Sequence, residues 1–289
     1  MTQLFRVCKE RLGRFVYRCN GRIPWTCGRG YGPYLNSYIE RVINDDHFLR
    51  ALQESGEVPA NFGMRLCERV IELPWVLAKL SQYQEKSRFL DAGSALNHQM
   101  ILQHPAARVH SWTVLTLAPE SNCFWEKGIS YVFDDLRSMP FRDGLFDAVF
   151  CVSVIEHIGM DNVSYTADDR YRENKPLDHL RAIAEMRRTL RPNGWLYLTV
   201  PFGRYENHGW LQQFDTTMLS ALIAHFEPQH VRKTFFRYGD CGWSVATEGQ
   251  CGDSSYSHIG KFCEHRESKP PRGSFAPTAS AVACVELQK

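Results

Sequence analysis

The strongest constraint on the fold comes from residues 89–98, which read FLDAGSALNH. A short apolar run ends in the acidic Asp91, a turn of small residues follows, and a helix start comes next. Only small side chains let backbone N–H groups and the N-terminus of the following helix approach a ligand closely. The pattern therefore predicts the first parallel strand of an α/β sheet, with a ligand-binding loop at its carboxyl end.

From residue 88 onward, the sequence predicts an alternation of strands and helices, which is typical of a mostly parallel sheet covered on both faces. We expect strands at 88–91, 110–117, 130–133, 147–152, 194–200, 230–238 and 280–287. Helices are expected at 178–190 and 216–226. The stretch 240–275 is rich in Gly, Ser, Cys and charged residues, and it predicts mostly loop.

The first 30 residues differ in charge from the rest of the chain. They hold seven Lys and Arg but only one acidic residue, so a chain of net charge +2 carries +6 here and about −4 elsewhere. Apolar residues at helical spacing over 4–19 predict a basic amphipathic helix. Such a helix can lie on an anionic membrane surface, or it can pack on the rest of the protein or on a second subunit with its arginines in water.

The next segment predicts a helical cap. Residues 28–33 indicate a linker, and helices are expected at 36–54 and 63–84, with a kink or break at Pro74. The sequence thus predicts three parts, which are a basic N-terminal segment, a helical lid region and one α/β domain, at 1–30, 31–85 and 86–289.

Composition limits the function classes. A net charge of +2 in 289 residues does not favour nucleic acid as a partner, and no apolar run approaches the ~20 residues that span a bilayer. Ten scattered cysteines indicate reduced thiols in a cytoplasmic protein. Cys241, Cys251 and Cys263 lack a closely spaced pair of ligands, so no metal site is expected there.

Two further motifs follow the first loop in order. Asp135-Leu136 precedes Pro140-Phe141, and Glu156-His157 follows the fourth predicted strand. With residues 89–98, these motifs resemble the class I S-adenosylmethionine-dependent methyltransferases, type 11. The resemblance implies a doubly wound, seven-stranded, mostly parallel Rossmann-like sheet with an antiparallel final strand and an N-terminal helical extension. It also implies S-adenosyl-L-methionine as the methyl donor.

The resemblance implies roles for individual residues in the donor site. Asp91 and Gly93 would meet the amino-acid tail and the sulfonium, and Asp135 and Leu136 would meet the adenine. The remaining residues that it places in the donor site are Ser94, Leu117, Thr116 and Cys151. Thr116 departs from the family, which usually ends its second strand in an acid that binds the ribose; Glu120 is the alternative ribose ligand.

The acceptor is less constrained than the donor. His157 and His208 are candidate general bases for an oxygen acceptor, although His157 can instead orient a loop. The combination of motifs resembles bacterial methyltransferases of polysaccharide synthesis. It implies a glycan or small-molecule acceptor, such as a sugar hydroxyl. We expect a cytoplasmic enzyme, and the basic helix at 4–19 is the segment that would contact the inner membrane face peripherally.

Two other function classes fit parts of the sequence. A non-catalytic binding module on a degenerate methyltransferase scaffold would explain Thr116 and the single glycine of the loop. A nicotinamide-dependent enzyme is disfavoured, because residues 94–98 do not supply the GxGxxG turn.

Overall fold

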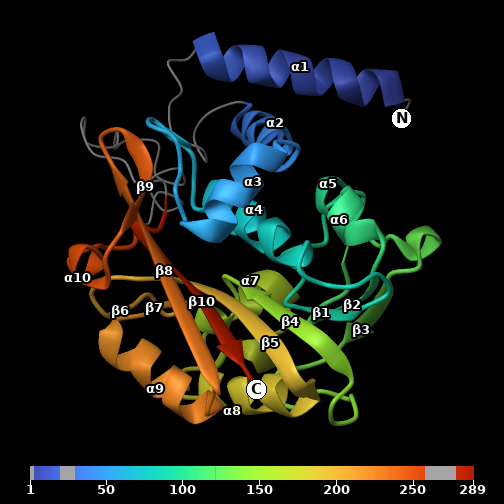
Figure 1. Cartoon of the computed structure of the whole chain (residues 1–289), viewed down its shortest axis with the longest axis vertical. Coiled ribbons are helices and arrows are strands. Elements are labelled where there is room, and N and C mark those ends of the chain that lie inside the picture. The colour runs from blue at the N-terminus through green and yellow to red at the C-terminus, as the bar shows by residue number, and fades with distance from the viewer. Residues whose placement is uncertain (1–2, 20–29, 121, 258–277) are drawn as a thin grey trace.

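The structure is a computed structural model that describes residues 3–19, 30–120, 122–257 and 278–289 (Figure 1). Its main sheet has eight strands in the order β3-β2-β1-β4-β5-β10-β8-β9. The strands are β1 (Arg88–Ala92), β2 (Ser111–Thr116), β3 (Ser130–Phe133), β4 (Phe146–Val152), β5 (Leu190–Pro201), β8 (His230–Gly239), β9 (Gly242–Ala246) and β10 (Ala281–Gln288). The predicted α/β fold with a mostly parallel sheet is confirmed.

The carboxyl-terminal strands complete the sheet. The strands from β3 to β5 pair in parallel, whereas β10 lies between β5 and β8 and runs antiparallel to both. The expected number of seven strands is wrong, because the chain turns back after β8 and adds β9 as an antiparallel edge strand. The expected loop at 240–275 therefore begins with β9 and the short helix α10 (Glu248–Cys251), and residues 258–275 lie outside the described residues.

Helices cover both faces of the sheet. The helices of the main body are α2 (Tyr31–Ile43), α3 (Asp46–Glu54), α4 (Arg69–Leu80), α5 (Gln99–Leu102), α6 (Pro105–Arg108), α7 (Val163–Thr166), α8 (His179–Thr189) and α9 (Thr216–Phe226). Short 3-10 turns lie at η1 (Trp125–Lys127), η2 (Ile155–His157) and η3 (Asp169–Tyr171), and a two-stranded ribbon joins β6 (Glu206–Asn207) to β7 (Gln212–Gln213).

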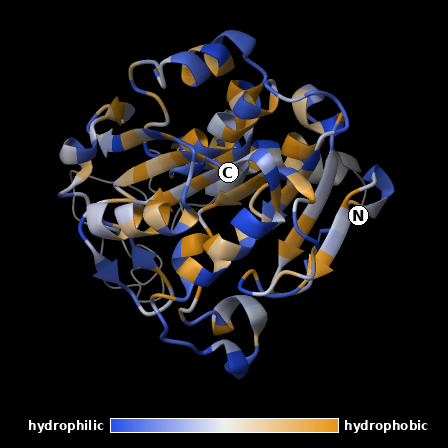
Figure 2. Cartoon of the chain, turned by 60° about the horizontal axis from the view of Figure 1, so that its bottom comes forward, coloured by the Kyte–Doolittle hydropathy of each residue, from blue (hydrophilic) through white to orange (hydrophobic). Residues whose placement is uncertain are grey.

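The two-residue period of a strand divides the core into two halves. Phe89 and Phe150 point to the face covered by α2, α3 and α4, whereas their neighbours Leu90 and Cys151 belong to the core on the side of α8 and α9. Figure 2 shows this patterning, with hydrophobic residues along the strands and both kinds of residue on the helices. Strands that are buried on both faces read as continuous apolar runs, as the sequence does at β4.

The helical cap differs from its prediction in its boundaries. The expected helix at 36–54 is two helices, because α2 ends at Ile43 and Asp45 caps the start of α3. The Asp45 Oδ1 accepts hydrogen bonds from His47 N and Phe48 N at 3.1 and 3.0 Å. Of the expected linker at 28–33, residues 28 and 29 lie outside the described residues and Tyr31 already begins α2. Pro74 lies inside α4 and does not break it.

The N-terminal helix α1 (Gln3–Cys19) lies on α2. Tyr17 is fully buried against Tyr31 and Tyr34, with ring centroids 5.7 and 4.9 Å away. On the other side of the helix, Leu12 and Phe15 are 63% and 64% exposed. None of the described helices has both the length and the apolar character needed to cross a membrane.

A buried carboxylate fixes the cap to the sheet. Glu72 of α4 is 0% exposed. Its Oε1 accepts hydrogen bonds from Ser153 Oγ and Thr199 Oγ1 at 2.5 and 2.6 Å, and its Oε2 lies 3.0 Å from Arg69 Nη1. A buried charge is tolerated only when such partners replace water. Glu72 thus fixes α4 to the carboxyl ends of β4 and β5.

We expect Glu72→Ala to lower the free energy of unfolding by about 3–5 kcal/mol, because it removes the ion-pair partner of Arg69 and the acceptor for the hydroxyls of Ser153 and the buried Thr199. Urea unfolding measures the effect. Glu40→Ala, on the exposed side of α2, is the matched control and should change the stability by less than about 0.5 kcal/mol. Equal unfolding midpoints for the two variants would contradict this role of Glu72.

Candidate functional site

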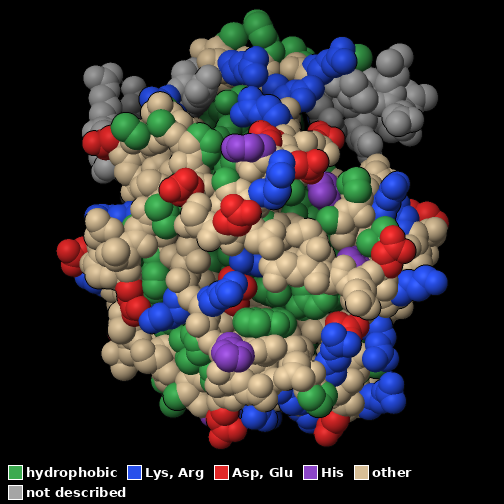
Figure 3. All heavy atoms as spheres, viewed as in Figure 1, with side chains coloured by type: hydrophobic (Ala, Val, Ile, Leu, Met, Phe, Trp, Pro, Cys, Tyr) green, Lys and Arg blue, Asp and Glu red, His purple; other side chains and the backbone are tan. Residues whose placement is uncertain are grey.

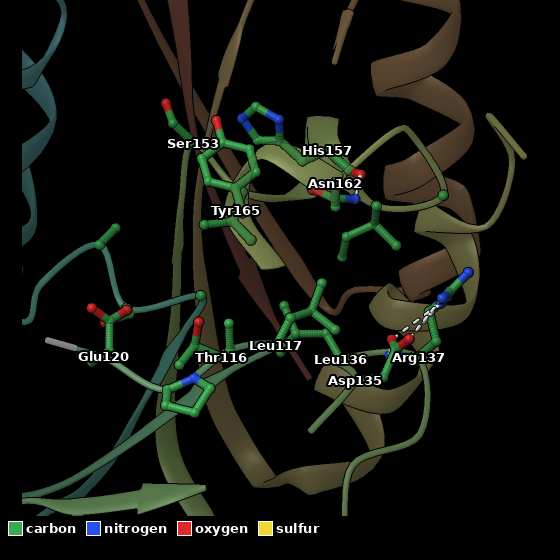
Figure 4. A pocket seen from close by; sticks show the side chains of 18 of the residues that line it. Thr116, Leu117, Glu120, Asp135, Leu136, Arg137, Ser153, His157, Asn162 and Tyr165 are labelled. Atoms are coloured by element: carbon green, nitrogen blue, oxygen red, sulfur yellow. Dashed lines mark hydrogen bonds and ion pairs between the residues drawn. The ribbon is translucent and has the colours of Figure 1, made fainter. Parts of the chain in front are cut away.

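A cleft of about 580 Å³ opens at the carboxyl ends of the central strands. Loops after β1, β2, β3 and β4 line it, together with the N-terminus of α4 and the segment that carries α7. Figure 4 shows Ser153, His157 and Tyr165 on one wall and Thr116, Leu117 and Leu136 on the opposite wall, with open space between them. Ligands of doubly wound sheets bind at this edge, where the strands end in loops.

The loop after β1 approaches the cleft through its backbone. Gly93 has φ 105°, and a Cβ at this position would lie 2.4 Å from Val154 Cγ2. Only glycine fits there, because both the left-handed backbone and the close contact exclude a side chain. Ser94 also has positive φ and lines the cleft, and its buried Oγ has no hydrogen-bond partner among the described residues.

Asp91 lies directly beneath this loop. It is 1% exposed, and its Oδ2 accepts a hydrogen bond from Leu96 N at 2.9 Å. Its Oδ1 is buried without a hydrogen-bond partner among the described residues. Burial raises the pKa of Asp91 to about 7. An unsatisfied buried carboxylate oxygen below a glycine loop suits a ligand that brings a positive charge.

The ends of β2 and β3 form the opposite wall. Thr116 and Glu120 both line the cleft, so both candidate ribose ligands are within it. Asp135 lines it too, but its carboxylate is already paired, with Oδ2 2.6 Å from Arg137 Nη2. Burial alone would raise the pKa of Asp135, yet the hydrogen bonds and charge of Arg137 hold it below its usual range.

Arg137 joins three carboxylates. Besides Asp135, its Nη1 lies 2.6 Å from Asp178 Oδ2 and 2.8 Å from Glu173 Oε2. Glu173 belongs to the polar segment 159–177 and lines the cleft, whereas Asp178 immediately precedes α8 and does not. The guanidinium therefore holds the polar segment against the end of β3.

His157 has a defined tautomer. Its Nδ1 lies 2.9 Å from the carbonyl oxygen of Trp210. A carbonyl only accepts, so Nδ1 carries the proton and Nε2 keeps its lone pair. Burial and the charge of Arg69 lower the pKa of His157 to about 4, although the Trp210 carbonyl opposes this. At neutral pH the ring is an uncharged hydrogen-bond acceptor on the wall of the cleft.

Three predicted site residues do not line the cleft. Asp91 lies beneath the loop after β1, and the other two lie farther away. The side chain of Cys151 belongs to the core between the sheet and α8, on the face away from the cap, and it does not line the cleft. His208 does not line it either; its Nε2 lies 2.9 Å from Glu206 Oε2 in the β6–β7 ribbon. The other predicted lining residues do meet at the cleft: Gly93, Ser94, Thr116, Leu117, Asp135, Leu136 and His157.

Several lining residues were not predicted. Arg69 enters the cleft from the first turn of α4, and Ser153 and Tyr165 come from the segment after β4. No short motif marks them in the sequence. The only signal was the position of residues 159–177 as a polar insertion at the edge of the sheet.

The chain is similar to known methyltransferases. A family model described as a methyltransferase domain matches residues 102–198. "Probable tRNA methyltransferase 9B" of Mus musculus is 28% identical over 145 residues, which are 46% of this chain and 29% of that protein. The chain thus spans less than a third of the length of this relative.

The chain is also similar, at low identity, to solved structures of methyltransferases. An N1-methyltransferase of 1,6-didemethyltoxoflavin from Burkholderia thailandensis, solved with S-adenosylhomocysteine, is 13% identical with a TM-score of 0.44 over 75% of this chain and 78% of that one. A methyltransferase from Methanosarcina mazei is 15% identical with a TM-score of 0.40 over 72% and 95%.

The residues of the cleft fit S-adenosylmethionine as the donor. Its ammonium and sulfonium are positive, and the unsatisfied Asp91 Oδ1 and Ser94 Oγ lie at the loop where the resemblance places them. Its ribose would lie near Thr116 and Glu120, and its adenine between Leu117 and Leu136 beside Asp135. The opposite wall carries His157 and Tyr165.

We expect Asp135→Ala to weaken S-adenosylmethionine binding by about 1–3 kcal/mol, because the variant removes an acceptor for the adenine amino group. Calorimetric titration measures it. The matched control is Asp178→Asn, which also removes a partner of Arg137 but lies outside the cleft. Equal losses in both variants would show that Asp135 acts only by holding Arg137.

Proposed function

Since the chain carries a class I S-adenosylmethionine-dependent methyltransferase domain, we propose that it transfers the methyl group to a hydroxyl oxygen of a small molecule or glycan. The observation that carries this proposal is the hydrogen bond of His157, which lines the cleft and whose Nδ1 lies 2.9 Å from the Trp210 carbonyl, so that Nε2 is left unprotonated. An attacking hydroxyl needs such an acceptor for its proton.

The residues of the cleft have separate tasks in this reaction. S-adenosylmethionine, when bound, supplies the methyl group and leaves as S-adenosylhomocysteine. The loop at Gly93 and the ends of β2 and β3 hold the donor. His157 Nε2 accepts the hydroxyl proton as the oxygen–carbon bond forms, and the Trp210 carbonyl keeps the ring in this orientation. Most of the rate enhancement comes from positioning, since the transfer is a direct displacement.

The finer features of the acceptor remain predictions from the sequence. We propose a sugar hydroxyl of a cell-surface polysaccharide precursor, in a cytoplasmic setting and without nucleic acid as a partner. Trp210 supports a sugar, because the C–H face of a sugar ring packs on aromatic side chains. The alternative is a non-catalytic module that has lost donor affinity, and donor binding separates the two.

We expect His157→Gln to lower kcat by about 10²–10⁴ while the affinity for S-adenosylmethionine stays unchanged. In the wild type, the acid limb of kcat/KM against pH should lie near pH 4, since His157 stays neutral down to about that value. Radiolabelled methyl transfer to a panel of monosaccharides and nucleotide sugars provides the assay.

Two results would contradict the proposal. If the wild-type chain gives no binding heat in a calorimetric titration with millimolar S-adenosylmethionine, it is a non-catalytic module. A chain that binds the donor and transfers methyl groups, but loses less than about threefold in kcat on His157→Gln, does not use this base.

We also propose that α1 contacts an anionic membrane surface, where a lipid-linked glycan would be presented. The exposed Leu12 and Phe15 support this, as do the basic residues around them. Figure 3 shows Lys and Arg side chains gathered over α1 and α2, next to hydrophobic ones. Apolar side chains inserted beside cations are how an amphipathic helix binds a lipid interface.

We expect the double variant L12S/F15S to bind anionic vesicles at least about tenfold more weakly, since each buried apolar side chain contributes about 1.5–3 kcal/mol. Sedimentation with phosphatidylglycerol vesicles at low and high salt measures it. Leu177→Ser removes another exposed apolar residue away from α1 and is the matched control. Unchanged vesicle binding of the double variant would leave α1 as a helix that only packs on α2.

A further inference from the structure

A smaller cavity of about 120 Å³ adjoins the wall of the cleft that carries His157 and Tyr165. Arg69, Ser153, His157 and Tyr165 line both cavities. The remaining wall of the small cavity consists of Glu68, Glu156, Pro201, Trp210, Tyr256 and Ala279. Its volume equals that of roughly four waters in the liquid, which suits a group of a few heavy atoms. If the hydroxyl of the acceptor binds at His157, the rest of the acceptor molecule can reach this cavity.

The charges on its wall are not balanced. The guanidinium of Arg69 is paired with Glu72, which lies outside the cavity wall. Glu68 and Glu156 do line the cavity, and neither makes an ion pair among the described residues. The Glu68 carboxylate accepts a hydrogen bond from Thr278 Oγ1. Two carboxyl groups therefore line this space with a single cation, Arg69, whose charge acts on both of them but which is already paired with Glu72.

Glu156 is the less satisfied of the two. It is only 2% exposed, and its Oε2 is buried without a hydrogen-bond partner among the described residues. Burial, together with the nearby carboxylate of Glu72, raises the pKa of Glu156 well above its usual range. A buried polar atom without a partner is costly, and such atoms in native proteins commonly mark a ligand site.

Aromatic rings form much of the remaining wall. Trp210 lies 6.1 Å from Tyr256 and 5.2 Å from His157, measured between ring centroids. Carboxylates combined with aromatic faces bind organic ammonium groups, through charge-assisted hydrogen bonds and cation–π contacts. The described residues contain no group of three His, Cys, Asp or Glu side chains placed to hold a metal ion. The wall thus has the chemistry of an ammonium site.

We infer that this small cavity binds a positively charged amino group of the methyl acceptor through Glu156 and Glu68. The acceptor is accordingly an amino alcohol, a class that includes the amino sugars. This inference rests on the proposed transfer to a hydroxyl, because it places that hydroxyl at His157 and the ammonium group in the neighbouring cavity.

The test compares 2-aminoethanol with ethylene glycol, which differ in a single group. Both are titrated into the full chain with saturating S-adenosylhomocysteine and followed by protein NMR. We expect 2-aminoethanol to bind at least about tenfold more tightly, since a charge-assisted hydrogen bond replaces a neutral one. Glu156→Gln should reduce this preference to less than about threefold.

A matched control has the same substitution at another carboxylate. Glu248 lies in a surface ion pair with Lys233, at 2.6 Å, and Glu248→Gln should keep the full preference for the amine. The affinity for S-adenosylhomocysteine is measured in all three proteins and should not change.

The outcomes are distinguishable. Equal binding of the two probes, no binding of either, or a preference that survives Glu156→Gln would overturn the ammonium site while leaving the donor site intact. A wild type that binds no S-adenosylhomocysteine would instead refute the proposed methyl transfer, whatever the result with the amine.

Discussion

The position of the cap depends on one buried carboxylate. Glu72 has no access to water, so its oxygens must be satisfied by protein groups, and those groups come from β4, β5 and α4 itself. The same contact orients Arg69 into the cleft. The geometry of this part of the cleft is therefore a consequence of how α4 is attached to the sheet. If the cap were attached only by apolar packing, no hydrogen bond or ion pair would fix the orientation of the Arg69 side chain.

The cleft divides its chemistry between two walls. On one wall, the loop after β1 lines the cleft at a position where only glycine fits, and Arg137 holds the polar segment to the end of β3. Burial shifts the pKa of His157 on the opposite wall and of Asp91 beneath the loop after β1, and the hydrogen bonds of both side chains oppose the shift. His157 stays neutral and Asp91 lies near the midpoint of its titration at physiological pH. The burial of each side chain, rather than its residue type alone, determines its protonation state.

The sequence predicts the strands well, because buried parallel strands are short apolar runs between turn signals. It also locates the glycine loop and the acid after β3. It does not predict β9, whose five residues carry a weak pattern and pair only through contact with β8. Cys151 was predicted to lie in the site because it is close in sequence to residues that line the cleft. Its side chain instead points into the core on one face of the sheet, because successive strand residues point to opposite faces. The sequence does not predict the places of Glu156 and Arg69 in the cavity walls, because those walls are formed with residues distant in the chain.

The place of β10 has a consequence for how the molecule is made. This strand, residues 281–288, lies between β5 and β8, so it separates two strands that precede it in the chain. During synthesis, β5 and β8 therefore leave the ribosome with unpaired edges and no partner for them. Unpaired edges are templates for aggregation, and these two edges are paired only when β10 has been synthesised and inserted between them. The two parts of the sheet are thus joined only after β10 has been synthesised, although β10 lies between them.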